Sequence, residues 1–106
     1  MIFDFKVEVF GSPKNTDLGE EIRGALSEVF GIEKRKIYIH EHYGRGNNDA
    51  NADAILVTIE KLMYYPLTAT NRKYALERVG DIMRLFVQKQ PHLLAFDVVF
   101  MPPIQY

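Results

Sequence analysis

The segment KIYIHEHY, residues 36–43, decides the fold because hydrophobic side chains alternate along it with aromatic and imidazole side chains. In an extended chain Ile37 and Ile39 point to one side, whereas His40 and His42 point to the other. This period of two predicts a β-strand with one side on the core. What the two histidines do depends on what covers the second side.

The chain before this segment predicts a strand and then a helix. Residues 2–10, IFDFKVEVF, alternate hydrophobic and charged side chains, as a half-buried strand does. Residues 17–30 carry hydrophobic side chains three and four positions apart, which indicates an amphipathic helix. Thr16 or Asp17 is expected to cap this helix, and Gly31 is expected to end it.

The chain after the segment repeats the same order of elements. The polar stretch GRGNNDAN, residues 44–51, predicts a loop. Alternation over residues 53–62 predicts a third strand, and helical spacing over residues 71–89 predicts a second helix that ends before Pro91. Residues 92–101 predict the last strand.

The order of elements predicts an α+β fold made of one duplicated β-α-β unit. The units span residues 2–43 and 53–102, and together they form a single domain over residues 1–106. Right-handed crossovers place both helices on the same face of one four-stranded sheet. The other face stays open, and its expected members are Asp4, Lys6, Glu8, Tyr38, His40, His42, Leu56, Thr58, Glu60, Ala95, Asp97 and Val99.

The open face has a mixed composition that allows two interpretations. A mixed polar and hydrophobic sheet face can meet water, as it does in many α+β proteins. It can also close against copies of itself around the axis of a symmetric oligomer. In either case Asp97, the one charge of the last strand, is expected to pair with His40, His42 or Lys6.

Composition excludes several classes of function. The 106 residues include 13 basic and 14 acidic side chains, so the net charge of −1 provides no field that attracts nucleic acid or an anionic membrane. The absence of cysteine excludes disulfides and thiolate ligands. The alternating start is unlike a signal peptide, and no hydrophobic run reaches the roughly 20 residues of a membrane span. We therefore expect a cytoplasmic protein with neither nucleic acid nor membrane as a partner.

Several stretches along the chain resemble the tautomerase superfamily, whose longer members include carboxymethyl-hydroxymuconate isomerase and macrophage migration inhibitory factor. The resemblance is carried by FDFKVEVF (3–10), GIEKRKIYIHEHY (31–43), NADAILVTIEK (51–61), NRKYALERVGDIM (71–83) and HLLAFDVVFMPP (92–103). It implies a duplicated β-α-β chain that assembles as a homotrimer. It also implies isomerisation of enol and keto acids without a cofactor.

The resemblance further implies a catalytic proline at the mature N-terminus, and this sequence differs there. Residue 2 is Ile2, and the first proline is Pro13, beyond the first strand. We therefore expect a protein without the standard proline-dependent reaction. The alternative is an active tautomerase in which the Met1 amine or His40 serves as the base, because an α-amine in an apolar pocket has a pKa near working pH.

Three further residues are candidates for binding a carboxylic acid. The resemblance places arginines near the second helix, and Arg72 lies in its first turn, where the helix dipole already favours an anion. Arg45 is a candidate anion clamp from the polar loop, and Tyr65 is a candidate wall of the pocket.

His40 and His42 are spaced like two ligands of one metal, about 7 Å apart along the strand. A metal site needs a third ligand, and the sequence offers only His92 and scattered carboxylates. From sequence we therefore expect no metal and no other cofactor. The expected function is a small trimeric tautomerase-like protein that binds a small carboxylic acid, with the active enol or keto-acid tautomerase as the alternative.

Overall fold

The computed structural model describes residues 2–12, 16–43, 54–63, 67–90 and 95–101. The chain folds in the order β-α-β-β-α-β, as the sequence predicted, with one short 3-10 helix in addition. The elements are β1 (Phe5–Ser12), α1 (Leu18–Phe30), η1 (Lys34–Lys36), β2 (Ile37–Tyr43), β3 (Ala54–Lys61), α2 (Ala69–Gln88) and β4 (Ala95–Phe100).

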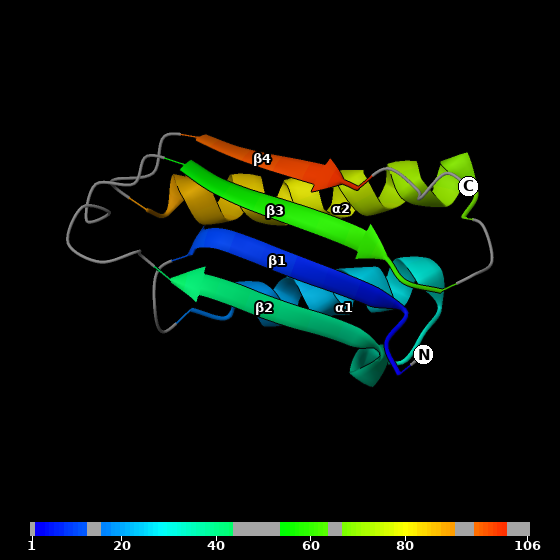
Figure 1. The fold of residues 1–106 in the computed structure, drawn as a ribbon. Helices are drawn as coiled ribbons and strands as arrows, with labels where there is room; N and C mark the ends of the chain where they lie inside the picture. The colour runs from blue at the N-terminus through cyan, green and yellow to red at the C-terminus, as the bar shows by residue number, and fades with distance from the viewer. Residues whose placement is uncertain (1, 13–15, 44–53, 64–66, 91–94, 102–106) are drawn as a thin grey trace.

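The four strands form one mixed sheet in the order β2-β1-β3-β4. Each β-α-β unit contributes a parallel pair, β1 with β2 and β3 with β4, and the two units meet through the antiparallel pair of β1 and β3. Both helices lie behind the sheet on the same side (Figure 1). The predicted sheet with one covered and one open face is therefore confirmed.

The central strand β1 shows how the alternation of side chains divides the two faces. Phe5, Val7 and Val9 are fully buried under the helices, while Lys6 and Glu8 lie partly exposed on the other face. Each fully buried side chain of this size stabilises the fold by about 1.5–3 kcal/mol relative to exposure. A slip of one residue would turn these three side chains into solvent, so burial determines the register.

The helices contribute the other half of the core. Leu18, Ile22 and Leu26 lie one helical turn apart on α1, and all three are fully buried. On α2 the corresponding stripe is Ala75, Val79 and Met83. Each helix therefore buries one stripe of hydrophobic side chains against the same face of the sheet, which is the arrangement that helical spacing predicts.

Several boundaries differ from the prediction by one to three residues, and two of the differences have a clear cause in local backbone chemistry. β1 does not stop at Phe10 but continues through a register shift to Ser12, because Gly11 adopts a φ of +85°. A Cβ at Gly11 would lie 2.8 Å from the carbonyl oxygen of Ala54, so this bulge requires glycine. α2 begins two residues earlier than expected, because the Thr68 side chain accepts a hydrogen bond from the Asn71 N–H at 3.0 Å.

The expected pairing of Asp97 was wrong. Two strands separate β4 from β2, which places Asp97 about 14 Å from either histidine at the usual strand spacing. Asp97 lies opposite Leu56, four residues along β3 from the partner of Lys6, and it is exposed. An exposed carboxylate meets water, so it does not need a charged partner.

None of the helices in the described part of the chain is long and apolar enough to cross a membrane.

Two glycines, one inside α1 and one at its end, offer a matched test of the fold. Gly31 ends the helix at a φ of +64°, whereas Gly24 lies inside the helix, where an added Cβ would meet nothing within 4 Å beyond its own stretch of helix. Gly31→Ala is expected to lower the free energy of unfolding by about 1 kcal/mol, because a side chain disfavours the left-handed region. Gly24→Ala is expected to raise it by about 0.5–1 kcal/mol through better helix propensity. Urea denaturation followed by circular dichroism measures both, and equal effects would contradict this account.

Candidate functional site

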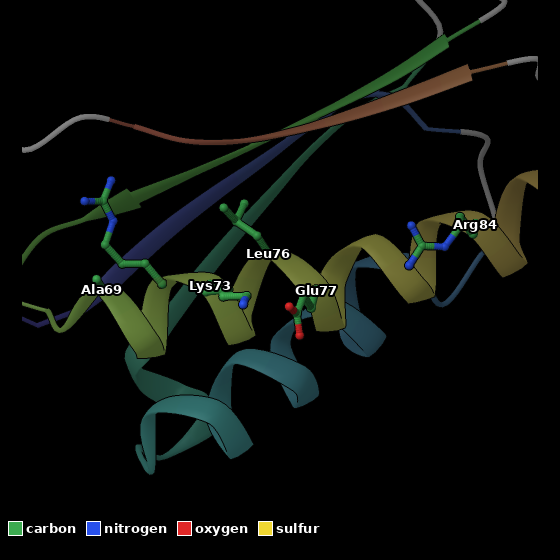
Figure 2. A pocket seen from close by; sticks show the side chains of 6 residues that line it. Ala69, Lys73, Leu76, Glu77 and Arg84 are labelled. Carbon is green, nitrogen blue, oxygen red and sulfur yellow. The ribbon is translucent and has the colours of Figure 1, made fainter.

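A shallow groove of about 520 Å³ runs along α2 and contains the predicted anion-binding residue Arg72. Figure 2 shows Leu76 pointing from the helix toward the sheet, between Ala69 near the start of α2 and Arg84 toward its end. The lining residues are Ala69, Arg72, Lys73, Leu76, Glu77 and Arg84. Three basic side chains and one acidic side chain give the groove an excess of positive charge.

The basic residues of the groove differ in their partners. Arg84 forms an ion pair with Asp81, one turn earlier on α2. Within the described ranges, neither Arg72 nor Lys73 has a carboxylate at ion-pair distance. A negative charge on a ligand would therefore find two cations at the beginning of α2 that no carboxylate of the described residues neutralises. The dipole of the helix adds to their attraction for an anion.

The ring of Phe100 holds Arg72 at a defined place against the sheet. Its guanidinium carbon lies 5.3 Å from the centre of the Phe100 ring, which is within the range of a cation–π contact. The Phe100 ring meets the rings of Phe5 and Phe30 at centroid distances of 6.3 and 6.5 Å. Since Phe5 is the first residue of β1, this cluster puts Arg72 at the same end of the sheet as the start of the first strand.

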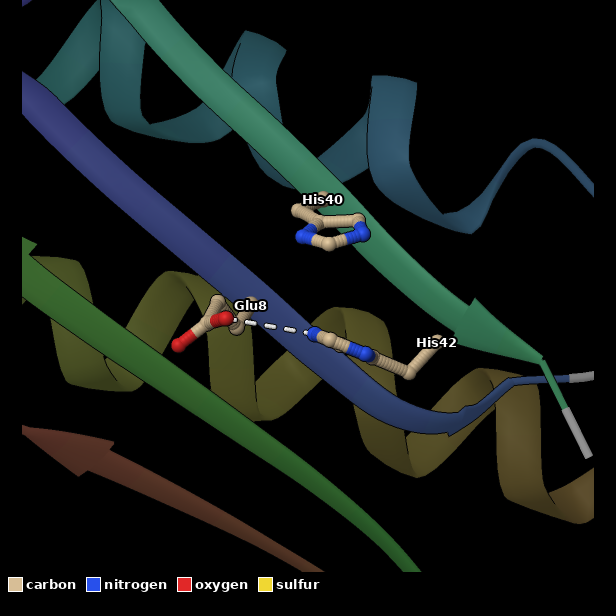
Figure 3. Close-up of side chains that lie close together, drawn as sticks. All are labelled: Glu8, His40 and His42. Atoms are coloured by element: carbon tan, nitrogen blue, oxygen red, sulfur yellow. Dashed lines mark hydrogen bonds and ion pairs between the residues drawn. The ribbon is translucent and has the colours of Figure 1, made fainter. Parts of the chain in front are cut away.

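A second group of polar side chains lies on the open face, where Glu8, His40 and His42 come together (Figure 3). Glu8 lies opposite His40 in the parallel pairing of β1 and β2. The carboxylate of Glu8 lies 3.2 Å from Nε2 of His42. The potential ligand atoms of the three residues all lie within 4.8 Å of one another.

The two imidazole rings are closer than their positions along the strand suggest. The ring centroids of His40 and His42 are 4.1 Å apart, against about 7 Å for two steps of an extended chain. On its other side His42 stacks on Phe10, with the centroids 4.3 Å apart and the planes 10° from parallel. His42 is therefore held by a ring on each side and by Glu8.

The structure separates two of the predicted site residues. His40 is exposed on the open face of the edge strand β2. Arg72 lies on α2, which covers the opposite face, and it contacts Phe100 on the other edge strand. Within one chain the two residues therefore do not line one pocket. The other predicted residues, Met1, Arg45 and Tyr65, lie outside the described residues.

Sequence reasoning missed Glu8 and Phe100 as members of these groups. The alternation of β1 assigned Glu8 to the open face, but its position opposite His40 depends on the register of a parallel pair. Strands joined by a helix can pair in several registers, and no turn of defined length selects one of them. A search for carboxylates on the open face at each possible register would have found Glu8.

No protein-family model matches the sequence, and no curated protein matches it. Solved structures do match. A fused 4-OT wild-type asymmetric trimer superposes with a TM-score of 0.62 at 13% identity, over 92% of this chain and 85% of that chain. The chain has the tautomerase fold.

Two other structures with the tautomerase fold are similar over most of their length. Pt0534, inactivated by 2-oxo-3-pentynoate, has a TM-score of 0.58 at 11% identity, over 92% of this chain and 85% of that chain. Malonate semialdehyde decarboxylase has a TM-score of 0.51 at 13% identity, over 90% of this chain and 83% of that chain. At these identities the tautomerase fold is shared, and function has to be argued from the residues.

The side chains of Arg72 and Phe100 are expected to be energetically coupled. Phe100→Leu keeps a hydrophobic side chain against the core but removes the ring face, and Arg72→Ala removes the cation. A double-mutant cycle by urea denaturation should give a coupling energy of about 0.5–1 kcal/mol, the range of a partly exposed cation–π contact. Strictly additive effects of the two substitutions would show that the guanidinium is not held by the ring.

Proposed function

We propose that this chain forms a homotrimer that binds a small carboxylic acid through Arg72 and lacks the standard proline-dependent tautomerase reaction. The observation that carries the proposal is the position of Arg72. Its guanidinium is held over Phe100 in a groove, and no carboxylate of the described residues neutralises it. The proposed role is binding, and catalysis is the alternative.

A carboxylate suits this groove better than other ligands do. The guanidinium is planar and offers parallel N–H donors that match the two oxygens of a carboxylate. Lys73, the next residue on α2, adds a second cation, and Leu76 offers a hydrophobic surface for the body of the ligand. A small organic acid combines these features, whereas a polyanion would meet a protein of net charge −1.

The similar structures support the same class of ligand. Pt0534 is inactivated by 2-oxo-3-pentynoate, and malonate semialdehyde decarboxylase is named for a small acid. Both ligands carry one carboxylate together with a carbonyl group. A keto acid or its enol form is therefore the class of ligand that we propose for this chain.

The homotrimer is proposed from the open face and from the assembly of a similar structure. The fused 4-OT structures are trimers. In this chain the large side chains of Tyr38 and Leu56 are 39% and 38% exposed on the open face. The edge strands β2 and β4 also leave backbone donors and acceptors for further strands. Closing the sheets against one another would cover both features.

The absence of the standard reaction is proposed from the residue at position 2. Structures of malonate semialdehyde decarboxylase include a variant in which the proline at position 1 is replaced by alanine. Here Ile2 stands where the resemblance places a proline, and it offers no secondary amine. The alternative is an active enol or keto-acid tautomerase whose base is the Met1 amine or His40. His40 lies on the opposite face of the sheet from Arg72, which argues against the histidine as the base for a ligand held by Arg72 of the same chain.

Removal of Arg72 is expected to weaken binding of a keto acid. Titration of phenylpyruvate, followed by calorimetry or by amide chemical shifts, should give an affinity at least about tenfold lower for Arg72→Ala, because a charge-assisted hydrogen bond is lost. Arg78→Ala is the matched control, since Arg78 lies on the same helix, pairs with Glu28 and is not part of the groove lining. Equal affinities of the two variants would refute the role of Arg72.

The same samples decide between binding and catalysis. The wild-type chain is expected to leave the rate of phenylpyruvate ketonisation at its value in buffer. A rate that is enhanced in the wild type and lost on acetylation of the N-terminus would support the Met1 amine as base. A rate that is lost in His40→Ala would support His40 instead.

Disruption of the open face is expected to dissociate the trimer. Light scattering should give about three times the chain mass of 12.3 kDa for the wild type and the monomer mass for Leu56→Asp, because a charge would be buried between sheets. Leu85→Asp is the matched control, since Leu85 is 59% exposed on α2, away from the open face. A monomeric wild type, or dissociation by both variants, would contradict the proposed interface.

A further inference from the structure

We propose that Glu8, His40 and His42 form a binding site for a divalent transition-metal ion, with Zn²⁺ as the representative ion. The three ligand atoms would be one carboxylate oxygen and one nitrogen from each imidazole ring. All three residues belong to one chain, so the site does not rest on the trimer or on the carboxylate binding proposed above.

The distances within the cluster are close to those of a metal site. A tetrahedral zinc ion with bonds of about 2.0–2.1 Å separates its ligand atoms by about 3.3 Å. The oxygen of Glu8 and Nε2 of His42 already lie 3.2 Å apart. The potential ligand atoms of the three residues lie within 4.8 Å of one another. Figure 3 shows the exposed His40 ring beside His42 on β2, and its nitrogen would have to move closer to join the same sphere.

The surrounding structure restrains Glu8 and His42, two of the three proposed ligands. The backbone pairing of β1 and β2 sets Glu8 opposite His40. Phe10 stacks on the His42 ring at a centroid distance of 4.3 Å and an angle of 10°. Such restraint reduces the conformational entropy that the ligands lose when a metal binds. Phe10 therefore acts as a positioning residue for His42.

The chemistry of the ligands selects the kind of metal. Two imidazoles and a carboxylate suit Zn²⁺, Cu²⁺, Ni²⁺ and Fe²⁺, whereas Mg²⁺ and Ca²⁺ prefer oxygen ligands alone. Three protein ligands leave at least one coordination position for water or a small anion, which is the arrangement of open zinc sites. In the single chain Glu8 and His42 are each about 30% exposed and His40 is more exposed, so an ion can reach the cluster from solvent before chains assemble.

A metal ion would also stabilise the close approach of the His40 and His42 rings. The centroids of two imidazole rings lie 4.1 Å apart on the open face of the single chain, although nothing in the backbone requires the rings to be this close. Without a metal, Glu8 is hydrogen-bonded to the ring of His42. A divalent ion would use both rings and the carboxylate together and would neutralise the charge of Glu8.

Zinc titration of the wild-type chain tests the site directly. Calorimetry with ZnCl₂ is expected to show one Zn²⁺ bound per chain, and MgCl₂ under the same conditions is expected to show no binding. His40→Ala, His42→Ala and Glu8→Gln should each lower the affinity for Zn²⁺ at least about tenfold. Glu60→Gln is the matched control, because Glu60 is a carboxylate on the same face but outside the cluster. The affinity of this variant for Zn²⁺ should equal that of the wild type.

A spectroscopic measurement on the wild type tests the ligand set independently of the variants. Electron paramagnetic resonance of the Cu²⁺ form should show coupling to two imidazole nitrogens. Absence of zinc binding, affinities of the ligand variants equal to that of Glu60→Gln, or fewer than one ion per chain would overturn the site. Light scattering and phenylpyruvate titration on the same preparations report on the proposed function separately, so failure of one proposal is not mistaken for failure of the other.

Discussion

The burial of one side of β1 is the constraint on which the rest of the structure depends. β1 is hydrogen-bonded to β2 on one side and to β3 on the other, and Phe5, Val7 and Val9 are fully buried under the helices. Because successive side chains of a strand point to opposite faces, this burial forces Glu8 onto the open face. The same strand therefore supplies the centre of the core and a member of the open-face cluster.

One-sided coverage of the sheet separates two kinds of chemistry. On the covered side, helix α2 brings Arg72 over Phe100, where a guanidinium with no carboxylate partner in the described part of the chain offers a place for a small acid. On the open side, two imidazoles and a carboxylate gather at one edge of the sheet. The sheet lies between the two groups, so each can be removed by substitution without touching the other. The proposals of carboxylate binding and metal binding are independent for this reason.

The tautomerase fold alone does not assign an activity to this chain, because identities of 11–13% show a common backbone and not a common site. The proposed binding of a small acid depends on how Arg72 is held and on its charge. The proposed metal site depends on the register of two parallel strands. Both are properties of this chain's own side chains, and neither requires the amine at the end of the chain.

The sequence by itself determined the order of the elements, the two faces of each strand and the end of α1, because these follow from local periodicity and from the conformational freedom of Gly31. It also placed Arg72 in the first turn of α2. Only the tertiary structure decided that Glu8 lies opposite His40, that Phe100 lies under Arg72, and that two strands separate Asp97 from β2. The physical reason is that strand order and register are set by contacts between residues far apart in the chain, where many alignments preserve the same alternation and only the packing of the whole core selects one.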